Sequence, residues 1–350
     1  MPGAAIVSLR RVPELLGPAA LVLAAALLGL AASASLQTYF LQTLVDVSIV
    51  VALYLFIGNS GVLSFGHIAF VALGVWTAGV LTVPESQKNA IMPGLAHFLF
   101  HAEVGNVLSL LLAALVGLGF AFVVGLPLMR LSGLAAGIAT FGVLVIVNNV
   151  LRYWDKLGPG LNAFSSVPQT TGIWQAAIGA LICVAIAFAY QCSRFGRKLR
   201  ATREDPAAAS AAGISIYRQR LIAFALSGAL AGFAGGLYVH MLPIEIDGLY
   251  LDLTFITLAM LVVGGSGSLL GAVVGALAVS GLDSFLSASE NGVTILGWHL
   301  NLPTGTADIV IGTLMAVVLI LHPAGLTGGR ELTLPRRRRV ADLRKARAPT

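Results

Sequence analysis

The sequence predicts an all-α polytopic membrane protein with about ten transmembrane segments, two of them broken at Gly/Ser-rich points. Of its 350 residues, 57% are hydrophobic and 10% are charged, against roughly 45–50% and 25% in soluble globular proteins. Long apolar runs without charge follow one another, and they contain many of the 40 glycines, which membrane helices tolerate better than soluble helices do. This composition excludes a free cytosolic enzyme, a nucleic-acid-binding module, a disulfide scaffold and a disordered chain.

The apolar runs divide into segments of a length suited to a bilayer. A helix needs about 20 apolar residues to cross the hydrocarbon core. Runs that are too long for one crossing are divided at polar or glycine-rich points, with Asp46 between the two longest. The predicted segments are 18–34, 39–57, 68–83, 106–128, 134–151, 173–190, 221–239, the two halves of 253–282, and 306–321.

The basic residues predict the orientation, because cytoplasmic loops are enriched in Lys and Arg. With both termini in the cytoplasm, 18 of the 21 basic residues fall on that side, and only Lys88, Arg152 and Lys156 fall outside. The first apolar stretch is too long for a cleaved signal peptide and is expected to stay as the first span. The predicted organisation is a cytoplasmic N-terminus (1–17), a transmembrane domain (18–322) with a cytoplasmic loop (192–220), and a basic tail (323–350).

Two Gly/Ser-rich stretches interrupt apolar runs in similar ways, and transporters often bind substrate where two such interrupted helices meet. We expect them to line a substrate path. The first contributes Asn59, Ser60, Gly61, Ser64, Gly66 and His67, and the second contributes Gly264, Gly265, Ser266 and Gly267. His67 is either a functional group in an apolar run or a hydrogen-bonded helix cap. Gly271 and Gly275, which follow the second break, are expected to serve close helix packing.

The sequence contains no energy source of its own for transport. It has no G-x-x-x-x-G-K-[ST] phosphate loop, and no ladder of membrane-embedded carboxylates suggests a proton relay. Asp46, Asp283 and Asp308 are expected at the ends of spans, with Asp46 the best candidate for an ion-coupling group. We therefore expect another subunit to supply the energy.

The loop 192–220 is where such a subunit could dock. Asp205 suits a helix N-cap, Pro206 the first helical position, and Gly213 the position just past the end. The result is an alanine-rich helix of about two turns, too short to be stable alone. We expect it to insert into a groove of a partner, although an ordinary connector is the alternative.

Several of these stretches resemble the M-type permease subunit of branched-chain amino acid ABC importers. Residues 63–70 resemble that family's L-S-x-G-H-x-x-F element, and residues 196–205 its cytoplasmic G-R-x-L-R-A-x-R-E-D loop. Residues 228–238 resemble its S-x-x-x-A-G-x-A-G-x-L-Y helix. Residues 263–268 and 322–326 resemble its V-x-G-G-x-G-S and closing R-P-x-G-L elements.

The resemblance implies a subunit of the bacterial inner membrane that is not itself an enzyme and binds no cofactor or metal. Its expected partners are a second homologous permease, two cytoplasmic ATP-binding subunits, a periplasmic substrate-binding protein and the lipid bilayer, but no nucleic acid. The coupling contact with an ATPase would then involve Arg200, Glu204, Asp205, Ala208 and Gly213.

Two departures from the family pattern leave other functions open. Residues 143–146 lack the acidic residue that the family usually has there, and the glycine-rich loop is reduced to 157–161. A permease for urea or short amides is therefore an alternative. An ion-coupled secondary transporter is another, for which Asp46 is the only indication. A serine protease using Ser60 with His67 or His240, and a metal site at His97 and His101, are weaker ones.

Overall fold

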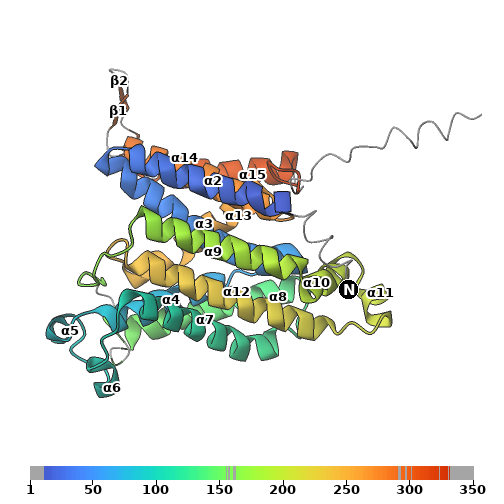
Figure 1. The fold of residues 1–350 in the computed structure, drawn as a ribbon, viewed down its shortest axis with the longest axis horizontal. Coiled ribbons are helices and arrows are strands. Elements are labelled where there is room, and N and C mark those ends of the chain that lie inside the picture. Colours follow the sequence, from blue (N-terminus) through green and yellow to red (C-terminus); the bar gives the residue numbers. More distant parts are fainter. Residues whose placement is uncertain are drawn as a thin grey trace, which may run out of the picture.

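The computed structural model describes residues 12–154, 156, 158–160, 163–290, 293–295, 298–300, 302–322, 324–329 and 331. These residues form ten apolar helices in one bundle, lying side by side along its long axis (Figure 1). The bounds are α2 Val12–Ala31, α3 Ala34–Ser60, α4 His67–Thr82, α7 Asn106–Leu128, α8 Gly133–Tyr153, α9 Ile173–Cys192, α12 Ile216–Val239, α13 Leu251–Gly264, α14 Leu269–Glu290 and α15 Thr306–Leu321.

Each of the predicted segments corresponds to one of these helices. Seven of them are long and apolar enough to cross a membrane, whereas α4, α13 and α15 are shorter apolar helices. That all ten cross, and that both termini are cytoplasmic, stays a prediction. Residues 1–11 and most of the tail 323–350, from 332 onward, lie outside the described residues.

The structure departs from an all-α fold at one point. Residues Val293–Ile295 (β1) and Trp298–Leu300 (β2) pair as a short antiparallel hairpin between α14 and α15. Short helical segments fill other connections: α5 Glu85–Ile91, α6 His97–Phe100, α10 Arg194–Glu204, α11 Pro206–Ala211 and the 3-10 turn η1 Ile246–Leu249.

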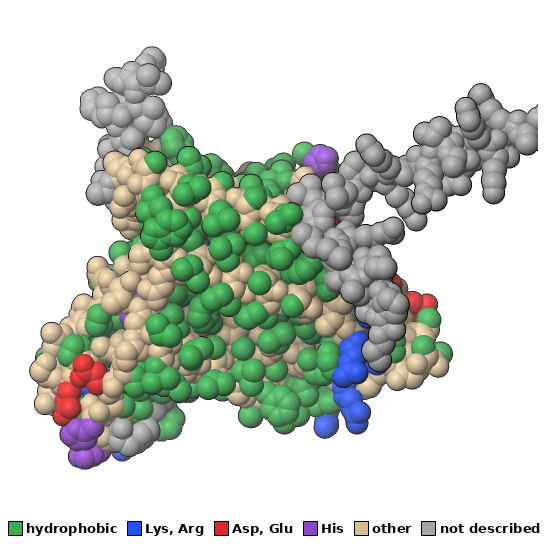
Figure 2. Space-filling view, in the orientation of Figure 1, with side chains coloured by type: hydrophobic (Ala, Val, Ile, Leu, Met, Phe, Trp, Pro, Cys, Tyr) green, Lys and Arg blue, Asp and Glu red, His purple; other side chains and the backbone are tan. Residues whose placement is uncertain are grey.

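The connections divide the molecule into two ends. We call the end with α10 and α11 the α10 end, and the opposite end, with α5, α6 and the β1–β2 pair, the hairpin end (Figure 1). In Figure 2 hydrophobic side chains cover the middle of the visible face, Lys and Arg gather at the α10 end, and Glu and His gather near α5 and α6. An apolar belt between charged ends is the surface expected of a protein embedded in a bilayer.

Helix α12 lies at the centre of the bundle, against α7, α4 and α3. Glycines allow this closeness: a Cβ on Gly74 would lie 2.1 Å from the carbonyl oxygen of Gly232, and one on Gly232 2.4 Å from that of Ala113. The α13–α14 pair is equally tight, because a Cβ on Gly275 would lie 1.9 Å from the Met260 carbonyl oxygen. The predicted packing role of Gly271 and Gly275 is thereby confirmed.

The expectation that Asp46 lies at the end of a span is wrong. Helix α3 runs unbroken from Ala34 to Ser60, so Asp46 lies well inside it, and its side chain is only 3% exposed. Its carboxylate accepts a hydrogen bond of 2.8 Å from Ser280 of α14. A carboxylate is costly in the interior of a bilayer. Here the fold buries it against another helix instead.

Candidate functional site

The first break joins α3 to α4 at the α10 end. Helix α3 ends at Ser60, and Gly61 takes a left-handed conformation (φ 70°) that terminates it. The chain then runs without helical hydrogen bonds to His67, where α4 begins. Side chains satisfy part of the freed backbone: the Val62 amide donates to Ser60 Oγ at 3.2 Å, and the Phe65 amide donates to Thr140 Oγ1 of α8 at 3.2 Å.

Two arginines of α10 hold the end of α3. Arg200 donates from Nε to Asn59 Oδ1 at 2.8 Å and from Nη2 to the Tyr54 hydroxyl at 3.1 Å, both on α3. It also donates to Gln191 Oε1 of α9 at 2.9 Å. Arg203 donates from Nη1 to the Gly58 carbonyl oxygen at 2.5 Å. These bonds link the predicted coupling loop directly to the first break.

The His67 side chain is buried and connects the start of α4 to α12 by hydrogen bonds. It is 1% exposed, with Nδ1 2.8 Å from Ser64 Oγ and Nε2 2.7 Å from Ser227 Oγ on α12. The rings of Phe56, Phe70 and Phe224 surround it. Both ring nitrogens are engaged in hydrogen bonds. Of the two interpretations given for His67 from the sequence, this geometry corresponds to the hydrogen-bonded residue at the start of a helix.

The second break joins α13 to α14 at the same end. Gly265 (φ 112°) follows α13, and the segment 324–329 packs against it. The Leu326 amide donates to the Val263 carbonyl at 2.8 Å, and the Thr327 amide donates to that of Gly264 at 3.2 Å. At the start of α14, the Leu269 amide donates to Glu331 Oε1 at 2.8 Å.

The Glu331 carboxyl occupies the N-terminus of α14, where the helix dipole favours a negative group. Burial nevertheless raises its pKa, and the backbone amides it faces and the positive charge of Arg200 only partly offset this. The second break is therefore held by backbone hydrogen bonds and one half-buried carboxyl group.

The two breaks touch each other. A Cβ on Gly58 would lie 2.7 Å from the carbonyl oxygen of Ser266. Of the predicted path residues, those of the first break, apart from Gly61, are buried in protein contacts, whereas Ser266 and Gly267 line a cavity beside α10. The structure thus gathers both groups at the α10 end of the bundle, and their part in a substrate path stays a prediction.

The short helix predicted in the loop is confirmed as α11. Asp205 Oδ1 accepts hydrogen bonds from the Ala207 and Ala208 amides, both at 2.9 Å, and Pro206 occupies the first helical position. Gly213 follows with a positive φ of 75°. Within the helix only Ala209 is buried, so the face carrying Ala208 is open to a partner.

The geometry does not favour the protease or the metal site. The Ser60 hydroxyl is bonded to the Val62 amide, His67 is bonded to Ser64 and Ser227, and His240 Nδ1 faces the Gly236 carbonyl. His101 pairs with Glu85 at 2.9 Å beside His97. Within the described part of the chain, no group of three His, Cys, Asp or Glu could hold a metal ion.

Sequence reasoning missed several residues of this site. Arg203 lay within the recognised loop motif, but only the structure shows it on the Gly58 carbonyl. Tyr54 and Gln191 are polar groups inside apolar runs, which was a usable signal. Thr140 and Glu331 gave no signal, because their partners are backbone amides distant in sequence.

Comparison with known proteins agrees with this architecture. Residues 35–319 match the family described as "Branched-chain amino acid transport system / permease component". The permease protein LivM of Salmonella typhimurium, from a high-affinity branched-chain amino acid transport system, is 25% identical over 81% of this chain and 68% of its own length. The autoinducer 2 import permease LsrC of Shigella flexneri is 27% identical over 62% of this chain and 68% of its own length.

A third relative is the probable branched-chain amino acid transport permease LivH of Methanocaldococcus jannaschii, 34% identical over 39% of this chain and 41% of its own length. No solved structure matches. The bundle of apolar helices defines a polytopic membrane protein. The chain belongs to the branched-chain amino acid transport system permease family, as a transmembrane subunit of an ATP-binding-cassette importer.

Proposed function

We propose that this chain helps import branched-chain or other aliphatic amino acids into the bacterial cytoplasm. It would do so in the inner membrane beside a second, homologous permease, with two ATP-binding subunits at the α10 end and a periplasmic binding protein at the hairpin end. The observation that carries the proposal is the direct link from α10 to the first break through Arg200 and Arg203. The family and the names of the relatives support the substrate class.

The hydrogen bonds suggest how the partner's work reaches the membrane. An ATPase that closes on ATP would push α11, and α10 would move with it because Asp205 joins the two helices. Arg200 and Arg203 would then shift the end of α3, and the break at 61–66 would let α3 and α4 change their relative angle. No residue of this chain performs covalent chemistry in this scheme.

The test is transport by the complete importer in proteoliposomes. The binding protein is enclosed in the lumen, which represents the periplasm, and the medium represents the cytoplasm. We expect leucine, isoleucine and valine loaded inside to leave the lumen only when ATP is added outside, and we expect urea not to compete. Movement of urea in place of these amino acids would contradict the substrate class.

A second function is considered because Asp46 is buried within α3. A secondary transporter could couple substrate movement to protonation of such a carboxylate. The same vesicles decide between the two: amino acid movement driven by a pH gradient, without ATP, would favour ion coupling. Asp46→Asn would then abolish it, whereas the ATP-driven importer should retain its dependence on ATP in this variant.

A further inference from the structure

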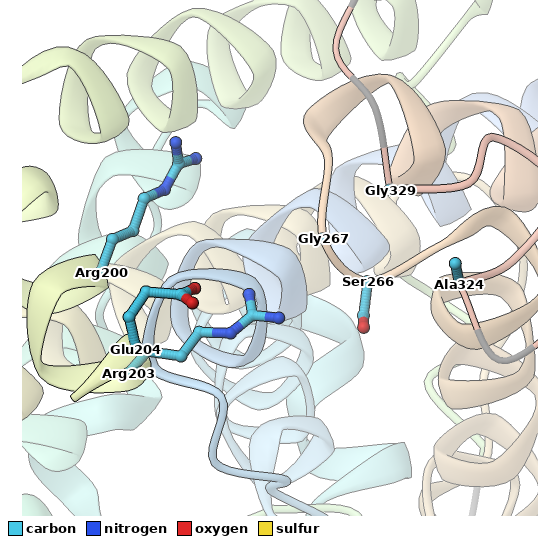
Figure 3. Close-up of a pocket in the computed structure, with 7 residues that line it drawn as sticks. All are labelled: Arg200, Arg203, Glu204, Ser266, Gly267, Ala324 and Gly329. Atoms are coloured by element: carbon cyan, nitrogen blue, oxygen red, sulfur yellow. The ribbon is translucent and has the colours of Figure 1, made fainter. Parts of the chain in front are cut away.

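A cavity of about 380 Å³ lies between α10 and the second break. Figure 3 shows Arg200, Arg203 and Glu204 on the α10 side, and Ser266, Gly267, Ala324 and Gly329 across the gap. Its volume falls within the roughly 300–1,000 Å³ of small-molecule sites. The cavity therefore has room for a small metabolite at the end of the bundle where the coupling loop lies.

The charges around the cavity are not neutralised by one another. Arg200 donates to three neutral oxygens, and Arg203 donates only to a backbone carbonyl. Neither arginine, nor Glu204, forms an ion pair with any other residue that the structure describes. Two guanidinium groups and one carboxylate thus face the same space, each with capacity for a further charged partner.

We infer that this cavity binds a small zwitterion, an α-amino acid of the transported class, on the cytoplasmic side, an inference that rests on the proposed function. The guanidinium groups of Arg203 and Arg200 match a carboxylate, for which arginine provides paired donors. The Glu204 carboxylate matches the ammonium group. The Ser266 hydroxyl offers a neutral hydrogen-bonding partner to either end.

A simple oxyanion fits this site less well than a zwitterion does. Phosphate or a lipid headgroup phosphate would be attracted by the arginines but repelled by Glu204, which lines the same cavity. Among the described lining residues, Ala324 supplies the single apolar side chain. We therefore expect recognition of the charged ends and little selection among aliphatic side chains.

The position of the site gives binding a consequence for transport. A ligand that bridges α10 and the Ser266–Gly267 loop would fix the distance between these two elements. The proposed coupling motion of α10 changes that distance, so the bound ligand would oppose it. Accumulated product would thus slow further import. Cytoplasmic leucine should lower the ATP hydrolysis rate of wild-type importer, and Glu204→Gln should remove that inhibition.

The direct test is equilibrium binding of labelled leucine to the assembled importer in phosphatidylcholine nanodiscs, without the periplasmic binding protein. Two competitors separate the charges: isocaproate, which lacks the ammonium group, and isoamylamine, which lacks the carboxylate. We expect Glu204→Gln to weaken leucine and isoamylamine by about tenfold or more, while isocaproate, which Glu204 repels, binds at least as tightly as to wild type. Arg203→Gln should weaken leucine and isocaproate by a similar factor.

Arg197→Gln is the matched control, because Arg197 is exposed on the same helix and does not line the cavity. Arg203 also donates to the Gly58 carbonyl oxygen, so Arg203→Gln could prevent assembly of the complex. In that case Arg203→Lys and Ser266→Ala replace it in the binding measurement. Both should weaken leucine binding by a smaller factor.

Wild-type affinity for leucine in both Glu204→Gln and an assembled Arg203 variant would overturn the inference. So would displacement of leucine by inorganic phosphate, or by phosphatidylglycerol in the nanodisc, with equal strength in wild type and Glu204→Gln. An importer that still moves leucine with ATP in any of these cases would show that the cavity assignment, and not the proposed function, is at fault.

Discussion

The two breaks of the bundle lie side by side but are held in different ways. The first, after Ser60, is held by side chains of α10, through Arg200 and Arg203. The second, after Gly264, is held by the backbone of 324–329 and by Glu331. Long side chains can move with a loop and re-form their bonds, whereas close backbone packing has few alternatives. The first break is therefore suited to receive motion, and the second to resist it.

The largest expected effect tests the rigidity of the second break. A Cβ on Gly264 would lie 2.0 Å from the Gly271 carbonyl oxygen, so Gly264→Ala must separate α13 from α14. We expect a loss of about 3 kcal/mol or more in unfolding free energy, seen as poor assembly and a lower melting temperature of the complex.

Gly281→Ala is the control, because a Cβ at this position of α14 meets nothing within 4 Å. It should assemble and melt like wild type. If Gly264→Ala behaved in the same way, the backbone packing described for the second break would be incorrect.

The next effect separates the two breaks directly. Arg200→Gln combined with Arg203→Gln removes the groups that α10 places on α3, leaving Asn59 and Tyr54 without their charged donor. We expect faster amide hydrogen exchange over 58–66, by tenfold or more for a loss of about 1.4 kcal/mol or more in local opening free energy, and little change over 264–270. Equal acceleration in both stretches would mean that α10 supports the bundle end as a whole.

Gly61→Ala is expected to act more weakly on the first break. Gly61 has a φ of 70°, and a residue with a Cβ pays roughly 1 kcal/mol there. Its Cβ would also lie 2.9 Å from Arg203 Cγ, a flexible side chain that can shift. We expect a slightly lower melting temperature and a measurable loss of ATP-driven uptake. Gly213→Ala, with a φ of 75° but open space around it, should show the strain alone.

The smallest effect concerns pH at the second break. Burial raises the pKa of Glu331 in the folded protein, so folding favours its protonated form. The stability it contributes is present at low pH and is lost as pH rises through that raised pKa. Glu331→Gln should flatten this part of the melting temperature profile between acidic and neutral pH. A steeper profile in the variant would contradict the sign.

Much of the fold was predictable because membrane spans appear in the sequence as long apolar runs without charge. Every predicted span corresponds to a helix, and the Asp205–Pro206 start of α11 was identified from capping preferences alone. The place of Asp46 was not predictable, because its burial depends on Ser280, far away in the sequence. Residue types indicated where the chain breaks, but only three-dimensional packing shows that the first break is bonded to α10 and that the second faces α10 across a cavity.

The site followed the same rule. The glycines and serines of the breaks were identifiable by their unusual density, and His67 by its isolation in an apolar run. That His67 bonds Ser227, and that Arg203 bonds Gly58, are consequences of tertiary contacts that no local pattern encodes.

The most direct test of the central claim is the number of leucine molecules moved per ATP hydrolysed by the reconstituted importer, compared between wild type and Arg200→Gln. If α10 passes the ATPase motion to α3 through this arginine, the variant should still hydrolyse ATP but move several-fold less leucine per ATP. Arg197→Gln should match wild type. An unchanged ratio in an assembled Arg200→Gln complex would show that the first break does not receive the motion.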